Sequence, residues 1–332
     1  MEIIAENDSI TSLRERRRLE YSVGPLLYMP ALRTDIAEKL SRGIEGLRSA
    51  AICLEDTIRD DMVEAAEENL LSQLDILAEN RPEHLPMIFI RVRSGEQLER
   101  LSEMPHSSLE LITGFILPKI DDITFMEYIP YLKRAFEKKS SLYIMPIIEN
   151  PSFLRLTTRY YKLERLYDEL MDIRDRVLNV RIGGNDFCKV LGLRADITST
   201  VYDILPVGQL ISDIAAVFAG EFTVSAPVWN YFQGGDARWI EGMEREIRTD
   251  RSIGLVGKTV IHPSQIAVVN KAMAVSRNDY DDARHILGNS GEIQVIKSSD
   301  GGRMYENKVH SGWAEKTLAL AEIYGISEET EQ

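Results

Sequence analysis

Short apolar runs alternate with amphipathic stretches along most of the chain. Eight runs have the length and apolar character of strands, at residues 26–29, 50–54, 87–92, 114–118, 142–148, 178–183, 222–226 and 258–262. Between them lie segments with helical spacing of apolar positions, for example 34–42, 60–78, 122–137, 207–219 and 237–247. Strands that alternate with helices indicate parallel βαβ units, and eight such units predict a closed (β/α)8 barrel. An open doubly wound sheet is the alternative, although no strand is followed by a glycine-rich phosphate-binding motif.

The pattern changes after the eighth run. We expect a helix from residue 263 to about 275 and a second near 280–287. Two β-prone runs, 293–297 and 303–309, flank a Ser-Ser-Asp-Gly-Gly segment and predict a hairpin, followed by a helix over about 314–324. The prediction is therefore an α/β chain with an N-terminal extension (1–23), a catalytic barrel (24–275) and a C-terminal helical and hairpin appendage (276–332).

The composition of the chain argues against some classes of binding partner. The formal charge of −14 argues against a nucleic acid, because a phosphate backbone requires a basic surface. No apolar run approaches the roughly 20 residues that cross a bilayer, and the acidic N-terminus does not resemble a signal peptide. The two cysteines, Cys53 and Cys188, fit a reducing compartment. We therefore expect a cytoplasmic protein that binds neither nucleic acid nor membrane.

Polar side chains gather where the predicted strands end. In a (β/α)8 barrel, the C-terminal ends of the strands surround the mouth where catalysis takes place. The polar and aromatic residues at or just after these ends are Arg33, Glu55, Asp56, Arg91, Lys119, Glu149, Asn150, Asn185, Asp186, Trp229, Asn230 and His262. The sequence thus places the candidate chemistry at one end of the barrel.

Glu149 and Asp186 are the candidate metal ligands. Each follows an apolar run, and the two runs are neighbours in chain order. Two carboxylates form a hard-oxygen site suited to Mg²⁺ and leave coordination positions open for a substrate. The glycines before Asp186 would let a ligand approach the backbone closely. The alternative is that both residues are helix N-caps at strand–helix junctions.

Arg91 lies inside a strongly apolar strand, where an unpaired guanidinium would be costly. It therefore requires an anion, either a structural carboxylate such as Glu55 or a substrate carboxylate bound through two hydrogen bonds. Glu55 and Asp56 could orient Arg91 or hold metal-bound water. Lys119 could reach a phosphate or carboxylate or be a solvated lysine, and Trp229 could line the pocket or belong to the core.

The same strand ends carry short blocks in a fixed order, which resembles the HpcH/HpaI aldolase and citrate lyase beta-subunit-like family over residues 24–326. The blocks are Leu27-Tyr28-Met29-Pro30 with Arg33, Leu54-Glu55-Asp56, Ile90-Arg91-Val92, Leu117-Pro118-Lys119, Ile148-Glu149, Gly184-Asn185-Asp186, and Gly257-Lys258 with Ile261-His262-Pro263-Ser264-Gln265. The resemblance supports the (β/α)8 prediction.

The resemblance implies a Mg²⁺-dependent carbon–carbon lyase that acts on a 2-oxo or 2-hydroxy acid, often as an acyl-CoA thioester. Glu149 and Asp186 match the metal ligands of the family. Arg91, Glu55 and Asp56 match its catalytic positions, and Glu306 is the best match to an acidic base contributed by a neighbouring subunit. Substrate contacts would come from Arg91 together with Arg33, Lys119 and Trp229. A homo-oligomer, a trimer or a hexamer, is expected, with the appendage packing on a neighbouring subunit.

The chain also departs from the family pattern. Pro30-Ala31-Leu32 replaces the usual Gly-Asn, the lysine often found after Leu-Glu-Asp is absent, and the spacer between Glu149 and Asp186 is longer than usual. These changes fall where the outer part of a ligand would contact the mouth, so CoA is not established as the carrier. Two alternatives remain open: a CoA-independent aldolase that acts on a 2-oxo acid, and a non-catalytic barrel within a larger assembly.

Overall fold

The computed structural model describes residues 15–233, 237–289, 295–298 and 301–328. The chain forms two compact units. One is Val23–Val269, and the other combines Met1–Ser22 with Asn270–Gln332. Most of the predicted N-terminal extension, residues 1–14, lies outside the described residues.

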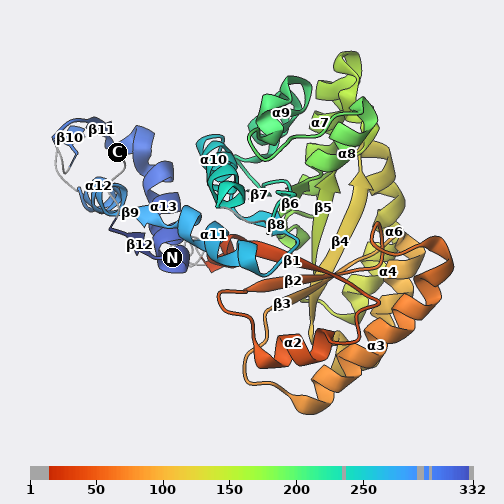
Figure 1. Ribbon diagram of the computed structural model, residues 1–332. Coiled ribbons are helices and arrows are strands. Elements are labelled where there is room, and N and C mark those ends of the chain that lie inside the picture. The colour runs from red at the N-terminus through yellow and green to blue at the C-terminus, as the bar shows by residue number, and fades with distance from the viewer. Residues whose placement is uncertain (1–14, 234–236, 290–294, 299–300, 329–332) are drawn as a thin grey trace, which may run out of the picture. The chain divides into compact units, whose positions relative to one another are not determined.

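Eight parallel strands form the centre of the larger unit (Figure 1). They are β1 (Pro25–Pro30), β2 (Ser49–Cys53), β3 (Met87–Arg91), β4 (Ile112–Ile120), β5 (Tyr143–Ile148), β6 (Val180–Ile182), β7 (Val224–Ser225) and β8 (Lys258–Val260). Neighbouring strands follow chain order, and β1 also pairs with β8. A parallel bridge between Ala226 and Lys258 joins the remaining edges, so the sheet is a nearly closed barrel. The predicted (β/α)8 fold is confirmed, and the open sheet is excluded.

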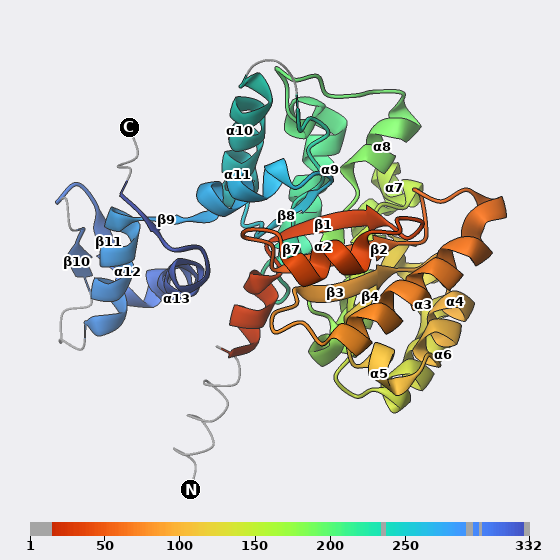
Figure 2. The same cartoon turned by 60° about the horizontal axis from the view of Figure 1, so that its bottom comes forward.

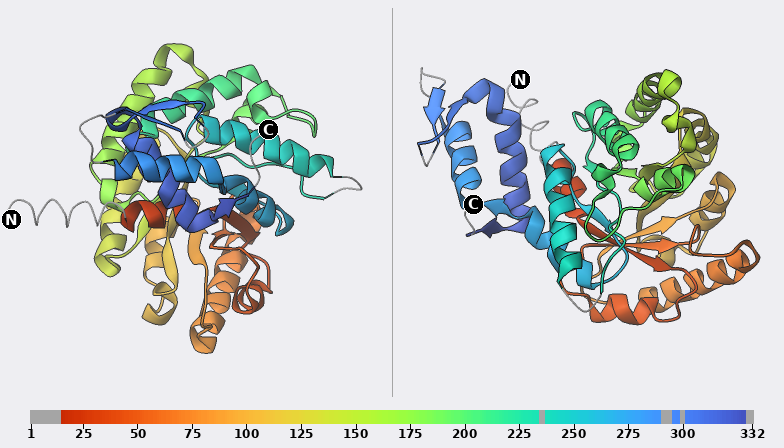
Figure 3. Two further views of the ribbon diagram at one scale, coloured as in Figure 1. Left: turned by 90° about the vertical axis from the view of Figure 1, so that its left-hand side faces the viewer. Right: turned by 45° about the horizontal axis from the view of Figure 1, so that its top comes forward.

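Helices follow the strands and lie around the outside of the barrel (Figures 2 and 3). They are α2 (Ile36–Arg42), α3 (Val63–Asn80), α4 (Gly95–Ser102), α5 (His106–Leu109), α6 (Asp122–Lys138), α7 (Leu156–Met171), α8 (Gly184–Leu191), α9 (Leu205–Phe218) and α10 (Arg238–Ser252), with α11 (Ser264–Met273) after β8. Because helices cover the outer face of the sheet and side chains fill its interior, the strands are buried on both faces. All five residues of β2 are buried, which explains why the strands read as continuous apolar runs.

The junction between β4 and α6 is fixed by a helix cap. The side chain of Asp121 accepts hydrogen bonds from the amides of Ile123 and Thr124, and the hydroxyl of Thr124 accepts from the Asp121 amide. This reciprocal capping box satisfies amides that the first turn leaves without partners. The cap residue, Asp121, is two residues after Lys119, so the capping box holds the end of β4 in place.

The terminal unit contains α12 (Arg277–Gly288), α13 (Asn307–Tyr324), an antiparallel pair β10 (Val295–Lys297) and β11 (Met304–Glu306), and a parallel pair β9 (Val275–Ser276) and β12 (Ile326–Ser327). Helices α12 and α13 pack together. Their small core consists of Ala283, Ile286, Tyr305, Ala314 and the partly buried Leu318. The predicted hairpin is confirmed where it is described, and residues 293–294 lie outside the described part.

The last helix corrects the sequence-based prediction. Helix α13 begins at Asn307 rather than near residue 314, and β11 ends at Glu306 rather than at residue 309. Gly312 and the polar residues before it obscure the helical pattern. Asn307 is buried, however, and its side-chain amide donates to the carbonyl of Asn289 at 3.1 Å. Packing against α12 therefore extends the helix by two turns beyond what local propensity indicates.

Within the described part of the chain, no helix combines the length and the apolar character needed to cross a membrane.

Candidate active site

A buried arginine lies at the centre of the polar residues at the barrel mouth. Arg91 is the last residue of β3 and is only 7% exposed. Its Nη2 atom lies 2.9 Å from Oε2 of Glu55, 3.0 Å from Oδ2 of Asp56 and 2.8 Å from Oε1 of Glu149. These carboxylates follow β2 and β5, so the barrel brings together residues from strands on both sides of β3. The guanidinium thus has the anionic partners that its burial requires.

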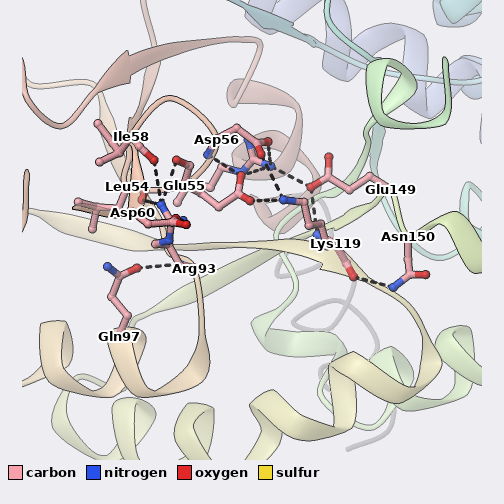
Figure 4. A network of polar contacts seen from close by, with 11 residues as sticks. Leu54, Glu55, Asp56, Ile58, Asp60, Arg93, Gln97, Lys119, Glu149 and Asn150 are labelled. Atoms are coloured by element: carbon pink, nitrogen blue, oxygen red, sulfur yellow. Dashed lines mark hydrogen bonds and ion pairs between the residues drawn. The ribbon is translucent and has the colours of Figure 1, made fainter. Parts of the chain in front are cut away.

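Lys119, on β4, completes this network (Figure 4). Its ammonium forms an ion pair with Glu55 and lies 3.2 Å from Oδ1 of Asp56. Its backbone amide donates to Oε1 of Glu149 at 3.0 Å. Lys119 therefore contacts both groups of carboxylates, one through its side chain and the other through its backbone.

Asp186 lies beside Glu149. It belongs to the first turn of α8, directly after β6, and β6 pairs with β5. Burial raises the pKa of Glu149 to about 8; Arg91 opposes this shift, and the neighbouring Asp186 carboxylate adds to it. Two neighbouring carboxylates repel each other, so Asp186 disfavours the ionised form of Glu149 and raises its pKa. A divalent cation would remove that repulsion.

Gly183 provides the space that this pair needs. A Cβ atom at this position would lie 2.2 Å from Oε2 of Glu149, too close for any side chain. The chemistry of the donor set also fits Mg²⁺, because both groups are carboxylates. We use the name mouth cluster for six residues: Glu55, Asp56, Arg91, Lys119, Glu149 and Asp186. With every member ionised, its four carboxylates and two cations leave two negative charges, which one Mg²⁺ would neutralise.

The described residues contain no group of three or more His, Cys, Asp or Glu side chains arranged to hold a metal. The candidate Mg²⁺ site therefore has two protein carboxylates, Glu149 and Asp186. A hard cation with so few protein ligands keeps water or substrate oxygens in its other positions. The arrangement fits a site where substrate completes the coordination.

The pKa values of the adjacent carboxyl groups Glu55 and Asp56 are shifted in opposite directions. Burial and the contact with Asp56 raise the pKa of Glu55, and Arg91 and Lys119 oppose this effect. Burial also disfavours the Asp56 carboxylate, but contacts with Glu55, Arg91 and Lys119 outweigh it and lower the pKa of Asp56 to about 2. Within this pair, Glu55 is therefore the weaker acid and Asp56 the stronger one.

Arg93 was not identified from the sequence, although it supports the site. Its guanidinium donates to the backbone carbonyls of Leu54 at 3.2 Å and Ile58 at 3.0 Å, and it forms an ion pair with Asp60. These contacts stabilise the conformation of the loop after β2, which carries Glu55 (Figure 4). The signal in the sequence is the Arg-Val-Arg spacing, since residues two apart at a strand end lie on the same face.

Tyr28 was not singled out from the sequence as a site residue either. The Cζ atom of Arg91 lies 5.9 Å from the centre of its ring, within the range of a cation–π contact. Burial raises the pKa of Tyr28 to about 12, against the opposing effect of Arg91 and Arg181, so its hydroxyl is a hydrogen-bond donor. Arg181, on β6, is buried and donates to Oγ1 of Thr259 at 2.8 Å.

Two predicted substrate contacts lie outside the mouth cluster's network of contacts. Arg33 is exposed, and its guanidinium binds the carboxylate of Asp35 at 2.8 and 2.6 Å. Trp229 is 2% exposed, and its indole N–H donates to the carbonyl of Trp239 at 3.1 Å. The Trp229 ring is therefore covered by protein, as in the core alternative. A substrate-binding role for either residue stays a prediction.

Glu306, the predicted base, is an exposed residue at the end of β11 in the terminal unit. Its amide lies 3.1 Å from Nδ1 of His310. A contribution of Glu306 to the barrel mouth stays a prediction.

Comparison with known proteins identifies a family over almost the whole chain. A family model described as carbon–carbon bond lyase of the TIM-barrel fold matches residues 17–326. No curated protein sequence matches the chain.

Several solved structures are similar in fold. CitE from Mycobacterium tuberculosis in complex with magnesium, acetoacetate and coenzyme A has a TM-score of 0.59 at 19% identity, covering 90% of this chain and 98% of that one. Malate synthase from Haloferax volcanii in a magnesium and glyoxylate complex has a TM-score of 0.59 at 15% identity, covering 90% and 87%. RipC from Yersinia pestis has a TM-score of 0.53 at 17% identity, covering 76% and 95%. At these identities the similarity shows the fold.

Proposed function

We propose that this chain, which belongs to the carbon–carbon bond lyase family of the TIM-barrel fold, is a Mg²⁺-dependent enzyme that cleaves or forms a 2-oxo or 2-hydroxy acid or its acyl-CoA thioester. The observation that carries the proposal is the buried contact between Arg91 and Glu149, next to Asp186. This contact places the Arg91 guanidinium, which can stabilise negative charge on a substrate, beside the candidate metal ligands Glu149 and Asp186. The magnesium complexes of CitE and malate synthase, similar in fold, support the choice of metal.

Mg²⁺ held by Glu149 and Asp186 would act as a Lewis acid and a template for the substrate carboxylate and the neighbouring oxygen. Arg91 would stabilise the enolate that carbon–carbon cleavage produces, since charge develops on the carbonyl oxygen as the bond breaks. The Nε atom of Arg91 is buried and has no hydrogen-bond partner among the described residues, so this donor remains for a substrate oxygen. Glu55 and Asp56 orient the guanidinium through contacts with its Nη2 atom.

Cleavage also requires proton transfer. A base removes the hydroxyl proton of the departing fragment, and an acid returns a proton to the enolate carbon. We assign the base to Glu306 of a neighbouring subunit in a homo-oligomer, a trimer or a hexamer, with the terminal unit packing on that neighbour. Mass measurement by light scattering tests the assembly, and mixing Glu306→Gln subunits with Asp186→Ala subunits, which lack one proposed metal ligand, tests the sharing. Recovery of activity in the mixture supports a shared site.

The metal site is tested by titrating Mg²⁺ into the protein and its Glu149→Ala and Asp186→Ala variants in a calorimeter. We expect both variants to bind Mg²⁺ at least about tenfold more weakly, because each loses one of two carboxylate ligands. Glu64→Ala, an exposed carboxylate on α3, is the matched control and should bind as the unmodified protein does. Unchanged affinity in Glu149→Ala and Asp186→Ala would overturn the proposal and favour a non-catalytic barrel.

The carrier is tested by thermal unfolding with ligands, since a ligand that binds the folded state raises the melting temperature. Protection by acetyl-CoA with Mg²⁺ supports an acyl-CoA substrate. Protection by pyruvate or oxalate with Mg²⁺, without any effect of acetyl-CoA, supports a CoA-independent aldolase instead.

A further inference from the structure

Lys119 has a backbone conformation that residues with side chains rarely adopt. Its φ of 55° lies in the left-handed region, where the Cβ atom crowds the following carbonyl. Among the described residues, only Arg81 is also a non-glycine with a positive φ. Arg81 caps the C-terminal end of α3, an ordinary place for this conformation. Lys119 lies within β4 instead, so local structure does not account for its conformation.

The left-handed residue interrupts the ladder between β4 and β5. Leu117 is paired with Pro146, and the next pair is Ile120 with Ile148, with a register shift between them. The Lys119 amide leaves the ladder and donates to the side chain of Glu149. Irregularities of this kind occur often beside active sites, where they redirect a group.

Tertiary contacts hold Lys119 in this conformation. Its carbonyl accepts hydrogen bonds from Nδ2 of Asn150 and Oγ1 of Thr124, each at 3.3 Å. Its ammonium binds the carboxylates of Glu55 and Asp56. Strain in the backbone persists where the surroundings determine a conformation in several independent ways, and such positions cluster at functional sites.

The two oxygens of Glu149 are consequently in different environments. Oε1 receives the Lys119 amide at 3.0 Å and Nη2 of Arg91 at 2.8 Å. Oε2 lies on the side of Gly183 and accepts no hydrogen bond from an N–H group of the described residues, and the Glu149 carboxyl also contacts that of Asp186. The carboxylate is therefore held through one oxygen, and the other remains available as a ligand.

We propose that Lys119 is a positioning residue whose left-handed backbone directs its amide to Oε1 of Glu149 and so presents Oε2, on the side of Gly183, to a divalent cation. The proposal rests on the Mg²⁺ site proposed above and adds a residue that does not touch the ion. Groups that orient a metal ligand typically contribute about 10- to 100-fold to metal affinity. Because the amide carries this role, it is separable from the ammonium of the same residue.

The test compares Lys119→Asn with Lys119→Val. Both variants lack the ammonium and keep the amide, so they differ mainly in tolerance of a positive φ. Asn adopts the left-handed region readily, whereas the β-branched Val side chain strongly disfavours it. We expect Mg²⁺ to bind Lys119→Val at least about tenfold more weakly than Lys119→Asn in a calorimetric titration without substrate.

Arg81 offers a matched control, because it has the same backbone conformation at a helix end that makes no described contact with the mouth cluster. Arg81→Asn and Arg81→Val should differ in melting temperature and bind Mg²⁺ with the same affinity. This comparison separates backbone strain in general from strain that positions Glu149.

Equal Mg²⁺ affinity in Lys119→Asn and Lys119→Val overturns the positioning role while leaving the metal site intact, provided that Glu149→Ala weakens binding. If Glu149→Ala binds Mg²⁺ normally, both the metal site and this inference fail. Should Lys119→Val not fold, the Lys119 amide proton provides the measurement in the metal-free protein. Its NMR resonance should shift upfield in Glu149→Gln, because a neutral amide is a weaker acceptor than a carboxylate. An unchanged resonance overturns the proposal.

Discussion

The guanidinium of Arg91 and the carboxylate of Glu149 lie 2.8 Å apart although 58 residues separate them in the chain. Arg91 ends β3, Glu149 follows β5, and β4 lies between these strands. Both side chains are nearly buried, with exposed fractions of 7% and 3%. In a closed barrel, the ends of strands that do not pair can still reach a common centre.

Arg91→Met should destabilise the protein strongly. The substitution leaves the buried carboxylates of Glu55 and Glu149 without their guanidinium partner, and breaking a buried pair in this way costs about 3–5 kcal/mol. Urea unfolding measures the loss. Arg134→Met, which removes an arginine from an ion pair with Glu99 at the surface, should leave the free energy of unfolding nearly unchanged. Equal stability of Arg91→Met and the unmodified protein would contradict the buried network.

Gly183→Ala should weaken Mg²⁺ binding at least about tenfold, because the new methyl group would displace Oε2 of Glu149. Calorimetric titration with Mg²⁺ measures this effect. Gly220→Ala is the matched control, since nothing lies within 4 Å of the position that its Cβ would occupy. If both variants bind Mg²⁺ equally well, the Glu149 carboxylate is not placed as described.

Asp121 should make stability depend on pH in acid. Burial opposes its ionisation, but hydrogen bonds from Thr124 and Ser152 and the Lys162 ammonium lower its pKa from 3.8 to about 2. A carboxylate whose pKa is lower in the folded state stabilises above the unfolded value, and this contribution is lost as the pH falls from about 4 to about 2. Asp121→Asn should therefore cost about 2 kcal/mol at pH 6 and much less at pH 2. Denaturant unfolding at both pH values checks the prediction, and an equal cost at both would refute it.

Lys258→Met should destabilise the barrel by about 3–5 kcal/mol. The Lys258 ammonium is fully buried at the start of β8, 2.8 Å from Glu246 and 2.9 Å from Asp250 on α10. Removal of the lysine leaves both carboxylates buried without a cation. Adding Glu246→Gln and Asp250→Asn to Lys258→Met should restore part of the loss in thermal unfolding. A triple variant less stable than Lys258→Met would show that the charges are not the cause.

The eight strands could be predicted because each is buried on both faces and is therefore visible as an apolar run. The residues at which the strands begin and end could not be predicted. The run at 222–226 contains a strand of only two residues, Val224–Ser225, because pairing depends on how far the neighbouring strands extend. The start of α13 was also missed, since the burial of Asn307 depends on packing against α12.

In the candidate site, the identity of the residues could also be predicted from the sequence, whereas their contacts could not. Residue types and their positions at strand ends were sufficient to single out Glu149, Asp186, Arg91 and Glu55. The contact between Arg91 and Glu149 was not predicted, because their separation depends on barrel closure. The left-handed φ of Lys119 was also unpredictable, since no glycine or asparagine marks the position.

The sequence by itself determined the number of strands, the class of barrel and the set of charged groups at its mouth. These properties are encoded locally, in hydrophobic periodicity and in the residues that follow each run. Only the tertiary structure decided which carboxylates share Arg91, which oxygen of Glu149 remains available and why β4 is strained at Lys119. Those relationships join residues from four strands, and distances of about 3 Å between hydrogen-bonding groups are set by the closed sheet rather than by any single segment.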